Sequence, residues 1–148
     1  MRVTDRQALR LQIMSHEGSG PMRHGRHFPY KCPADKWTIG YGRNLEDVGI
    51  SADEARDLLD HDIQECLKDL GSFAWWEGLD PVRQRALCDM RFQLGSVGFR
   101  GFTRMVFALE QGQFDDAAAH ARDSKWARQD SPARAATIAA MIETGTEA

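Results

Sequence analysis

The stretch from Ser51 to Leu70 limits the fold of this chain more than any other part of the sequence. Ser51 and Glu54 stand at the spacing of a capping box, in which each side chain hydrogen-bonds the other residue's backbone amide at the start of a helix. Behind the box, apolar residues recur at helical spacing, namely Ala55, Leu58, Leu59, Ile63, Cys66, Leu67 and Leu70. The pattern predicts one helix about 30 Å long. Because its apolar stripe is narrow, we expect this helix to connect two lobes.

The sequence before this helix mixes element types. We expect a helix over residues 4–16, with Thr4 as its N-cap and Gln7 as its capping-box partner. Residues 18–29 are rich in Gly, Pro, His and Arg and have no periodicity, which indicates a loop. Lys36 to Gly42 alternates large and small residues, which is typical of a short strand in a small antiparallel sheet.

The sequence after the connecting helix is patterned as helix throughout. Asp80-Pro81 is an N-cap followed by proline, and that helix should stop at Gly95. Three further helices are expected, over residues 102–109, over 114–122, and from Ser131-Pro132 to near Gly145. The fold class is therefore α+β: a single domain over 1–148 with a loop and small sheet at 16–50, a connecting helix at 51–70, and a helical lobe made of 71–148 and helix 4–16.

Composition and charge exclude several classes of protein. Apolar content of 42% and charged content of 28% indicate a globular chain. The net charge is −3, and residues 43–71 hold nine acidic and three basic residues, so the chain gives no general argument for nucleic acid as a partner. No apolar run near the N-terminus is long enough for a signal peptide or membrane anchor, so we expect the protein to be made and kept in the cytoplasm.

The cysteines and tryptophans are interpreted as structural, with one exception. Three cysteines do not form a disulfide framework, and Cys66 and Cys88 lie on apolar helix stripes, so we expect reduced core residues. Trp75, Trp76 and Trp126 are also expected in the core. Cys32 lies instead in a segment rich in turn residues, and it has to be considered with the candidate site.

Glu17 is the first candidate for chemistry. It ends an amphipathic helix and precedes glycines, so its carboxyl could face a cleft. A carboxyl group beside apolar side chains has a raised pKa and can act as a general acid near neutral pH. The alternative from the residues alone is an exposed glutamate at a helix end.

Several short motifs, taken together in order and spacing, resemble one known family. They are Glu17-Gly18, Tyr30-Lys31-Cys32, Thr38 to Asn44, Phe92 to Gly95, Gly101-Phe102-Thr103, Ser124-Lys125-Trp126 and Thr144-Gly145. The chain is similar to the phage-type lysozymes, the endolysins of tailed phages and prophages, from about Arg6 to Gly145.

The resemblance implies an activity and a set of site residues. In this family a Glu protonates the departing glycosidic oxygen, an Asp or Cys acts on the opposite face of the sugar, and a Thr six positions later helps to hold water; the matching residues are Glu17, Cys32 and Thr38. The implied reaction cleaves the β-1,4 bond between N-acetylmuramic acid and N-acetylglucosamine in peptidoglycan. Gln93 matches a residue that lines the cleft, and Arg134 matches an arginine that pairs with the catalytic Glu.

The same resemblance sets the expected partners. Bacterial peptidoglycan is the substrate, no cofactor or metal is needed, and the protein is expected to be a monomer. A holin-like membrane pore would release it to the wall at lysis.

The chain departs from the family pattern in the loop after Glu17. Fourteen residues, Gly18 to Lys31, separate Glu17 from Cys32, which is longer than usual. This basic loop could contact anionic wall polymer or act as a lid, or it could be a tolerated surface insertion. It also holds zinc-ligand residue types near Cys32, with His16, His24 and His27, but their spacing matches no zinc motif.

Two residues, Cys32 and Asp35, are candidates for the second catalytic group. A free thiol has a pKa of about 8.5, so Cys32 would need a lowered pKa, which Lys31 or the basic loop could provide. Asp35 lies midway between Cys32 and Thr38 and could supply a carboxylate, or it could simply cap the turn.

Two other functions fit the same sequence. A lytic transglycosylase needs the Glu but neither the Cys nor the Thr, and it leaves an anhydro sugar where a hydrolase leaves a reducing sugar. In a non-catalytic wall-binding or virion protein on the same scaffold, Glu17→Gln would leave the function unchanged.

Overall fold

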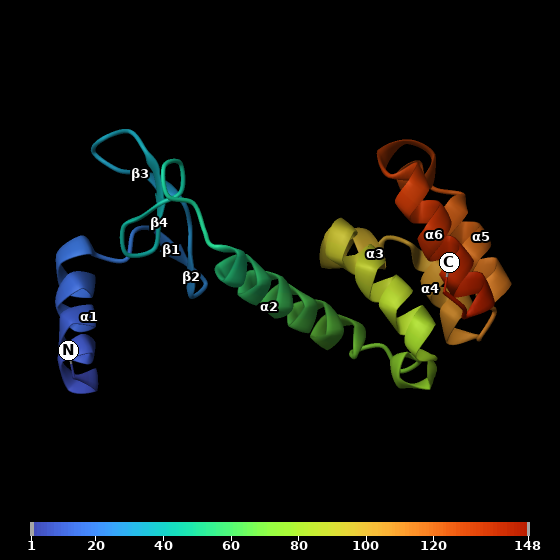
Figure 1. The fold of residues 1–148 in the computed structure, drawn as a ribbon. Helices are drawn as coiled ribbons and strands as arrows, with labels where there is room; N and C mark the ends of the chain where they lie inside the picture. The colour runs from blue at the N-terminus through green and yellow to red at the C-terminus, as the bar shows by residue number, and fades with distance from the viewer. Residues whose placement is uncertain (1, 148) are drawn as a thin grey trace. The chain divides into compact units, whose positions relative to one another are not determined.

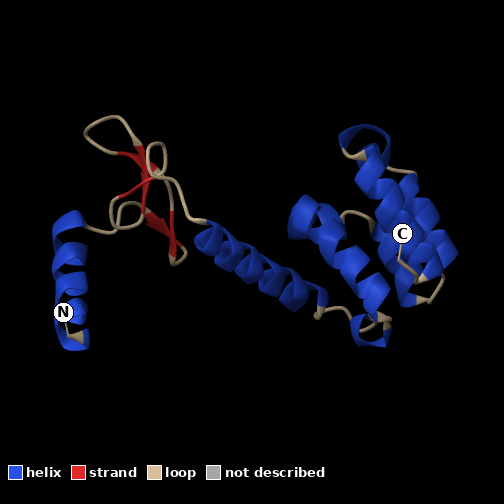
Figure 2. Cartoon of the chain, in the orientation of Figure 1, coloured by secondary structure: helices blue, strands red, loops and turns tan. Residues whose placement is uncertain are grey.

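The computed structural model describes residues 2–147 and divides at Arg56 and Asp57 into two compact units (Figure 1). The first unit holds one helix and all the strands, and the second is helical (Figure 2). The α+β class expected from the sequence is confirmed. The helix α2 (Ala52–Leu70) begins in the first unit and continues into the second.

The first unit consists of helix α1 (Val3–Glu17) and two small antiparallel sheets. Strands β1 (Met22–Arg23) and β2 (Arg26–His27) form a hairpin, and strands β3 (Tyr30–Lys31), β4 (Trp37–Ile39) and β5 (Arg43–Asn44) form a three-stranded sheet in the order β3-β4-β5. The strand expected over Lys36–Gly42 is present, but it ends at Ile39 because Gly40 and Gly42 turn the chain with positive φ.

Two expectations for the first unit are wrong. Residues 18–29 are not all loop, since the β1–β2 hairpin lies within them, and its strands are too short to leave a periodic pattern. The hairpin turns at His24 and Gly25, both with positive φ, as the tightest hairpin turns require. Thr4 is not an N-cap: α1 starts one residue earlier, at Val3, and has no side-chain cap.

The start of α2 follows the expected capping box. The Glu54 amide donates to the Ser51 hydroxyl at 3.2 Å, and the Ser51 amide donates to the Glu54 carboxylate at 2.7 Å. Arg43 donates to the same carboxylate at 2.7 Å, which attaches β5 to the first turn of the helix.

The second unit contains the hydrophobic core. Its helices are α3 (Pro81–Arg100), α4 (Thr103–Glu110), α5 (Phe114–Arg122) and α6 (Pro132–Thr144), with short turns η1 (Trp76–Gly78) and η2 (Trp126–Asp130). Helix α5 packs against α4 and α6, and α3 packs against α6 (Figure 1). The fully buried side chains include Leu70, Leu87, Met90, Phe99 and Ile142.

The predicted helix boundaries in this unit hold with one difference. Asp80 caps α3, as expected, by accepting from the amides of Val82 and Arg83 at 3.0 Å. The helix breaks at Gly95, where φ is 72° and ψ is 170°, but the chain returns to helix and continues to Arg100. Gly95 is therefore a kink and not an end.

The tryptophans and cysteines of this unit behave largely as expected. Trp76 and Trp126 are buried, and Trp75 packs against the core from its edge. Cys66 and Cys88 are free thiols; Cys66 is buried and Cys88 is only half-buried.

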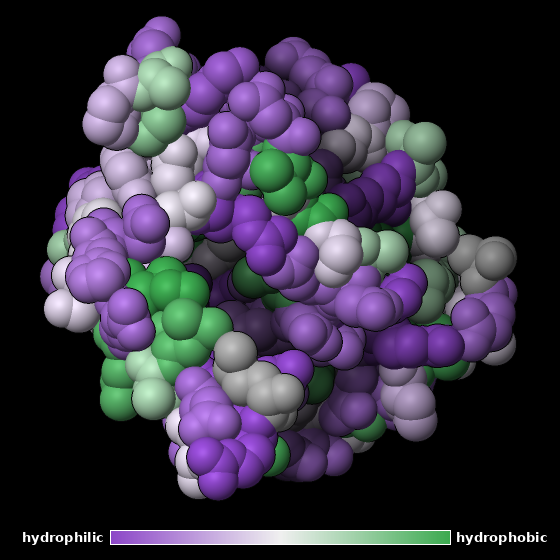
Figure 3. All heavy atoms as spheres, turned by 60° about the vertical axis from the view of Figure 1, so that its left-hand side comes forward, coloured by the Kyte–Doolittle hydropathy of each residue, from purple (hydrophilic) through white to green (hydrophobic). Residues whose placement is uncertain are grey.

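Apolar side chains also remain at the surface of both units. Exposed examples are Leu11 and Ile13 on α1 and Leu59, Leu67 and Phe92 on α2 and α3. Figure 3 shows one face, where green apolar groups interrupt a mostly purple surface. Among residues 2–147, no helix is both long and apolar enough to span a membrane.

Candidate active site

Glu17 is the last residue of α1, and its side chain is exposed. The helix ends there because Gly18 takes a positive φ of 69° and its amide closes on the Met14 carbonyl at 3.1 Å. The carboxylate reaches the backbone of Gly42: a methyl group built on Gly42 would lie 3.1 Å from Glu17 Oε2. Gly42 also has a φ of 88°, so both its conformation and its closeness to Glu17 favour glycine.

Cys32 and Thr38 lie on the three-stranded sheet of the same unit. Cys32 directly follows β3, and its amide donates to the Lys36 carbonyl at 3.0 Å. Thr38 is in the middle of β4, opposite Tyr30 and Asn44, and is only 3% exposed. Its hydroxyl donates to the Lys36 carbonyl at 3.1 Å and also lies within hydrogen-bonding reach of the Cys32 sulfur. The sheet register therefore brings these two candidates together.

The local backbone lowers the pKa of the Cys32 thiol below its ordinary value. The largest cause is a hydrogen bond from the backbone at Lys36, followed by one at Ala34, and the Thr38 side chain adds to them. The expectation that Lys31 would supply this effect is not met, because its ammonium group pairs with Glu46 at 3.0 Å and lies over the Trp37 ring. The cause is hydrogen bonding by the turn between β3 and β4.

Asp35 lies in that turn. It has a φ of 57°, and its amide donates to the Cys32 carbonyl at 2.8 Å, so its backbone closes the turn. Its side chain is 91% exposed and only 3.9 Å from the Lys31 ammonium group. These contacts favour the turn interpretation of Asp35 over the catalytic one.

Gln93 lies on α3 in the second unit, with both ends of its amide engaged there. Its oxygen accepts from the indole N–H of Trp126 at 2.9 Å, and its nitrogen donates to the Ser131 hydroxyl. The amide orientation is thus fixed by η2 and by the residue that precedes α6.

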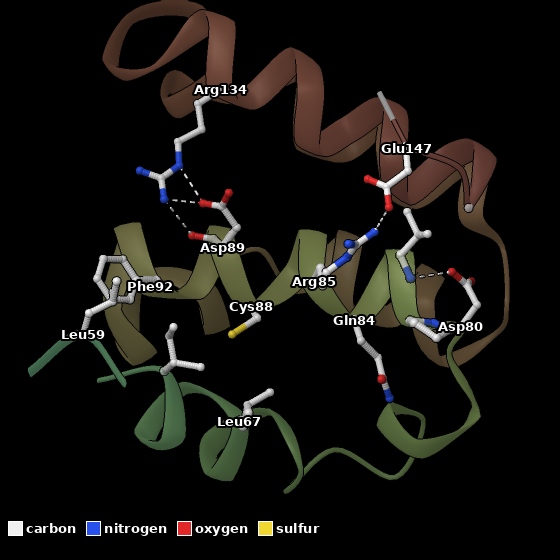
Figure 4. Close-up of a pocket in the computed structure, with 14 residues that line it drawn as sticks. Leu59, Leu67, Asp80, Gln84, Arg85, Cys88, Asp89, Phe92, Arg134 and Glu147 are labelled. Carbon is white, nitrogen blue, oxygen red and sulfur yellow. Dashed lines mark hydrogen bonds and ion pairs between the residues drawn. The ribbon is translucent and has the colours of Figure 1, made fainter. Parts of the chain in front are cut away.

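Arg134, on α6, forms an ion pair with Asp89 of α3, in which its Nε donates at 2.7 Å. Both residues line a cavity of about 890 Å³ between α2, α3 and α6, whose floor is apolar and includes Leu59, Leu67 and Phe92 (Figure 4). The expected pairing of Arg134 with Glu17 stays a prediction.

Of the histidines considered as zinc ligands, His27 has other contacts. His27 Nδ1 lies 2.8 Å from the Ser19 carbonyl, and its ring meets Tyr41 edge-on with centroids 5.3 Å apart. Within residues 2–147, no three His, Cys, Asp or Glu side chains come together in a way that could hold a metal ion.

Sequence reasoning missed three features of this region. Gly42 and Tyr41 belong to a sequence motif, but the motif does not show that Gly42 adjoins Glu17 or that Tyr41 contacts His27. Trp126 lies in the core, as expected, and also orients Gln93. A glycine at position 42, inside a strand-like pattern, is a sequence signal for another group approaching the backbone closely. No sequence signal pairs Trp126 with Gln93.

Comparison with known proteins gives a family match. A family model described as "Phage lysozyme" matches residues 23–138. The matched span contains Cys32, Thr38, Gln93 and Arg134, while Glu17 lies six residues before its start.

Individual relatives are only modestly similar to the chain in sequence. The pre-baseplate central spike protein Gp5 of Enterobacteria phage T4 is 32% identical over 100 residues, which is 65% of this chain and 17% of the spike protein. Probable T4-type lysozymes 1 and 2 of Dictyostelium discoideum are 28% and 27% identical over 101 residues, 66% of this chain and 59% of each relative. The chain therefore matches less than two thirds of the length of these relatives.

Proposed function

Because this chain belongs to the phage lysozyme family, we propose that it is a glycoside hydrolase that cleaves the glycan strands of bacterial peptidoglycan, at the bond between N-acetylmuramic acid and N-acetylglucosamine. Cys32 with a lowered pKa beside the buried hydroxyl of Thr38 is the observation that carries the proposal. Both lie in the unit that holds Glu17. An acid and a second basic group are what glycoside hydrolysis requires.

In the proposed reaction, Glu17 donates its proton to the departing glycosidic oxygen. The bond to the anomeric carbon breaks as positive charge develops on the sugar, and a water molecule adds to that carbon from the opposite face. The Cys32 thiolate takes the proton of this water, and the Thr38 hydroxyl holds the water in line. Exchange with solvent then returns the proton to Glu17 and removes it from Cys32.

The lowered pKa of Cys32 supports its role as the base, because it raises the fraction of thiolate near neutral pH. The exposure of Glu17 leaves room for a polymer to reach the carboxyl, and substrate itself would then exclude water from it. Gln93 and Arg134 are proposed as residues that contact the strand farther from the reacting bond.

The test measures release of soluble fragments from purified peptidoglycan. Glu17→Gln and Cys32→Ala should each lower the rate by roughly 100-fold or more, the usual contribution of an acid or base. Asp35→Asn should keep most activity, and Glu77→Gln, an exposed glutamate of η1, is the matched control. Retained activity in Cys32→Ala with loss in Asp35→Asn would move the second role to Asp35.

The products separate hydrolysis from its alternatives. A hydrolase leaves reducing ends, and anhydro ends would mean a lytic transglycosylase. A folded wild-type protein that releases neither product would contradict the enzyme proposal.

A second candidate is a wall-degrading component of a phage particle, favoured by the 32% identity with the central spike protein. It would use the same chemistry during entry instead of lysis. Presence of the chain in purified particles would support it. Accumulation in the host cytoplasm as a monomer, followed by release through a phage-made membrane pore, would support the endolysin role.

A further inference from the structure

The segment that carries Glu17 is held only weakly by its own residues. Helix α1 has no buried residue, and Glu17 is followed by Gly18, Ser19 and Gly20, in which both glycines have positive φ. Glycines lose more backbone freedom on ordering than any other residue, so such a segment is costly to fix in one conformation. A catalytic acid nevertheless has to stay within about 0.5 Å of its working position. Contacts from elsewhere in the first unit must therefore hold Glu17 in place.

The β1–β2 hairpin provides one of these contacts, just after Glu17 in the chain. The ring nitrogen Nδ1 of His27, on β2, lies 2.8 Å from the carbonyl oxygen of Ser19. A carbonyl oxygen can only accept, so Nδ1 carries the proton and donates it to this bond. Both residues are half-buried. The bond thus fixes the backbone two residues beyond Glu17.

The same histidine makes a second contact, which leads to the other side of Glu17. Its ring meets Tyr41 edge-on, with centroids 5.3 Å apart, a favoured geometry for two aromatic rings. Tyr41 directly precedes Gly42, whose backbone adjoins the Glu17 carboxylate. The tyrosine also lines a hollow on α1 with Leu9, Ile13 and Met14. Through Tyr41, His27 is therefore connected both to α1 and to the turn that faces the carboxylate.

The hairpin that carries His27 is itself anchored at its base. The Phe28 amide donates to the Pro21 carbonyl at 2.9 Å, which closes the hairpin below its two strands. The ring of Tyr30 packs against Gly20 so closely that a methyl group added there would lie 2.5 Å from it. A hairpin anchored in this way can hold the His27 ring in a fixed place.

We propose that His27 is a positioning residue for Glu17, which holds the acid by donating to the Ser19 carbonyl and by packing against Tyr41. The proposal rests on the proposed function, since it takes Glu17 as the acid. It assigns the long segment between Glu17 and Cys32 a role as a brace for the acid. His27 itself has no part in the proton transfers.

The first test measures kcat and KM on soluble glycan fragments. His27→Leu removes both contacts and should lower kcat about tenfold, because a small displacement of a catalytic group is costly. KM should stay within about twofold of wild type, since no group that binds the strand is changed. A loss of stability alone would not produce this split in a protein that is still folded, which circular dichroism verifies.

Two further substitutions separate the two contacts of His27. His27→Asn keeps a donor near the place of Nδ1 but loses the ring, and His27→Phe keeps a ring but loses the donor. Each should recover part of the kcat that His27→Leu loses. Tyr41→Leu should also lower kcat, and Tyr41→Leu combined with His27→Leu should lose less than the product of the two losses, since both remove the same ring contact.

The matched control is His24→Asn, in the turn of the same hairpin. It removes a histidine of the same charge type, and asparagine tolerates the positive φ of 50° at this position. Its kcat should equal that of wild type. An equal loss in His24→Asn would overturn the proposal, and so would an unchanged kcat in folded His27→Leu or a change confined to KM.

The second test does not depend on activity. The Gly18 amide, which donates to the Met14 carbonyl at 3.1 Å at the end of α1, should exchange with solvent faster in His27→Leu than in wild type or His24→Asn. Equal exchange rates in all three proteins would count against the brace. Failure of the proposed function would appear differently, as wild-type protein that releases no fragments while the exchange comparison still gives its own answer.

Discussion

At the scale of single residues, Gly42 determines how close Glu17 can come to the sheet. Gly42→Ala adds a methyl group 3.1 Å from the Glu17 carboxylate and forces a side chain into a φ of 88°. Gly40→Ala imposes a similar backbone penalty at a φ of 61° but meets no atom within 4 Å. Each should lose about 1 kcal/mol of unfolding free energy.

Only Gly42→Ala should also lower kcat/KM, by roughly tenfold, since small displacements of a catalytic group are costly. Steady-state kinetics on soluble glycan fragments, beside thermal unfolding of both variants, separates the two effects. Equal kinetics for the two variants would mean that the contact with Glu17 has no part in catalysis.

At the scale of elements, Asp69 attaches the end of α2 to α3. Its carboxylate accepts from Arg91 at 2.9 Å and from Arg100 at 2.6 Å. Burial by itself would raise the pKa of Asp69, but hydrogen bonds from Ser96, Arg100 and Arg91 outweigh it and lower the pKa from 3.8 to about 2. The folded pKa is thus below the unfolded one, so the stabilisation is complete above pH 4 and disappears as pH falls through 2.

Asp69→Asn should therefore cost about 2 kcal/mol at pH 7, following the pKa difference, and less as the pH approaches 2. Denaturant unfolding at several pH values measures this. Asp62→Asn, an exposed acid of the same helix, is the control and should stay close to wild type throughout. A cost for Asp69→Asn that is independent of pH would contradict the argument.

How far the sequence predicts each element depends on whether its signal is local. The capping box of α2, the prolines that start α3 and α6, and the glycine after α6 give those boundaries, because caps and breakers act over four or five residues. The end of α3 is the exception, since Gly95 only kinks the helix, which continues to Arg100. The sequence does not reveal the β1–β2 hairpin, because two-residue strands have no period. The cap expected at Thr4 fails because the helix already begins at Val3, which places Thr4 inside its first turn.

The candidate site divides in the same way. Cys32 and Thr38 follow from motif and spacing, whereas the source of the lowered Cys32 pKa, the backbone at Lys36 and Ala34, depends on how the turn folds. The hydrogen-bond partners of Gln93 and Arg134 lie 33 to 45 positions away in the sequence, so no local pattern predicts these contacts.

At the scale of the whole molecule, stability is unevenly distributed between the two units. The buried hydrophobic cluster lies between Leu70 and Ile142, entirely in the second unit, whereas α1 has no buried residue. Local opening is easiest where few apolar contacts are broken. The two units should therefore differ in how readily their backbones exchange with solvent.

Hydrogen exchange measured by mass spectrometry should show slow amides in α3, α5 and α6, with opening free energies near the global value. Amides of α1 and of the β1–β2 hairpin should exchange far faster. Leu87→Ala, a substitution that costs about 2–5 kcal/mol of unfolding free energy in a buried core, should speed exchange of the slow amides and leave exchange of the fast amides unchanged. Uniform protection across both units would contradict this division.

One arginine also affects when the second unit can be completed during synthesis. Arg83, at the start of α3, donates to the carbonyls of Ile142 and Glu143, 59 and 60 residues further along the chain, and lies over the ring of Phe114. A ribosome that adds 5–20 residues per second makes Ile142 and Glu143 roughly 3–12 s after Arg83 itself. Nascent chains still short of Ile142 lack both hydrogen bonds, so a stalled or prematurely terminated product should present an open helical unit to the host's proteases and chaperones.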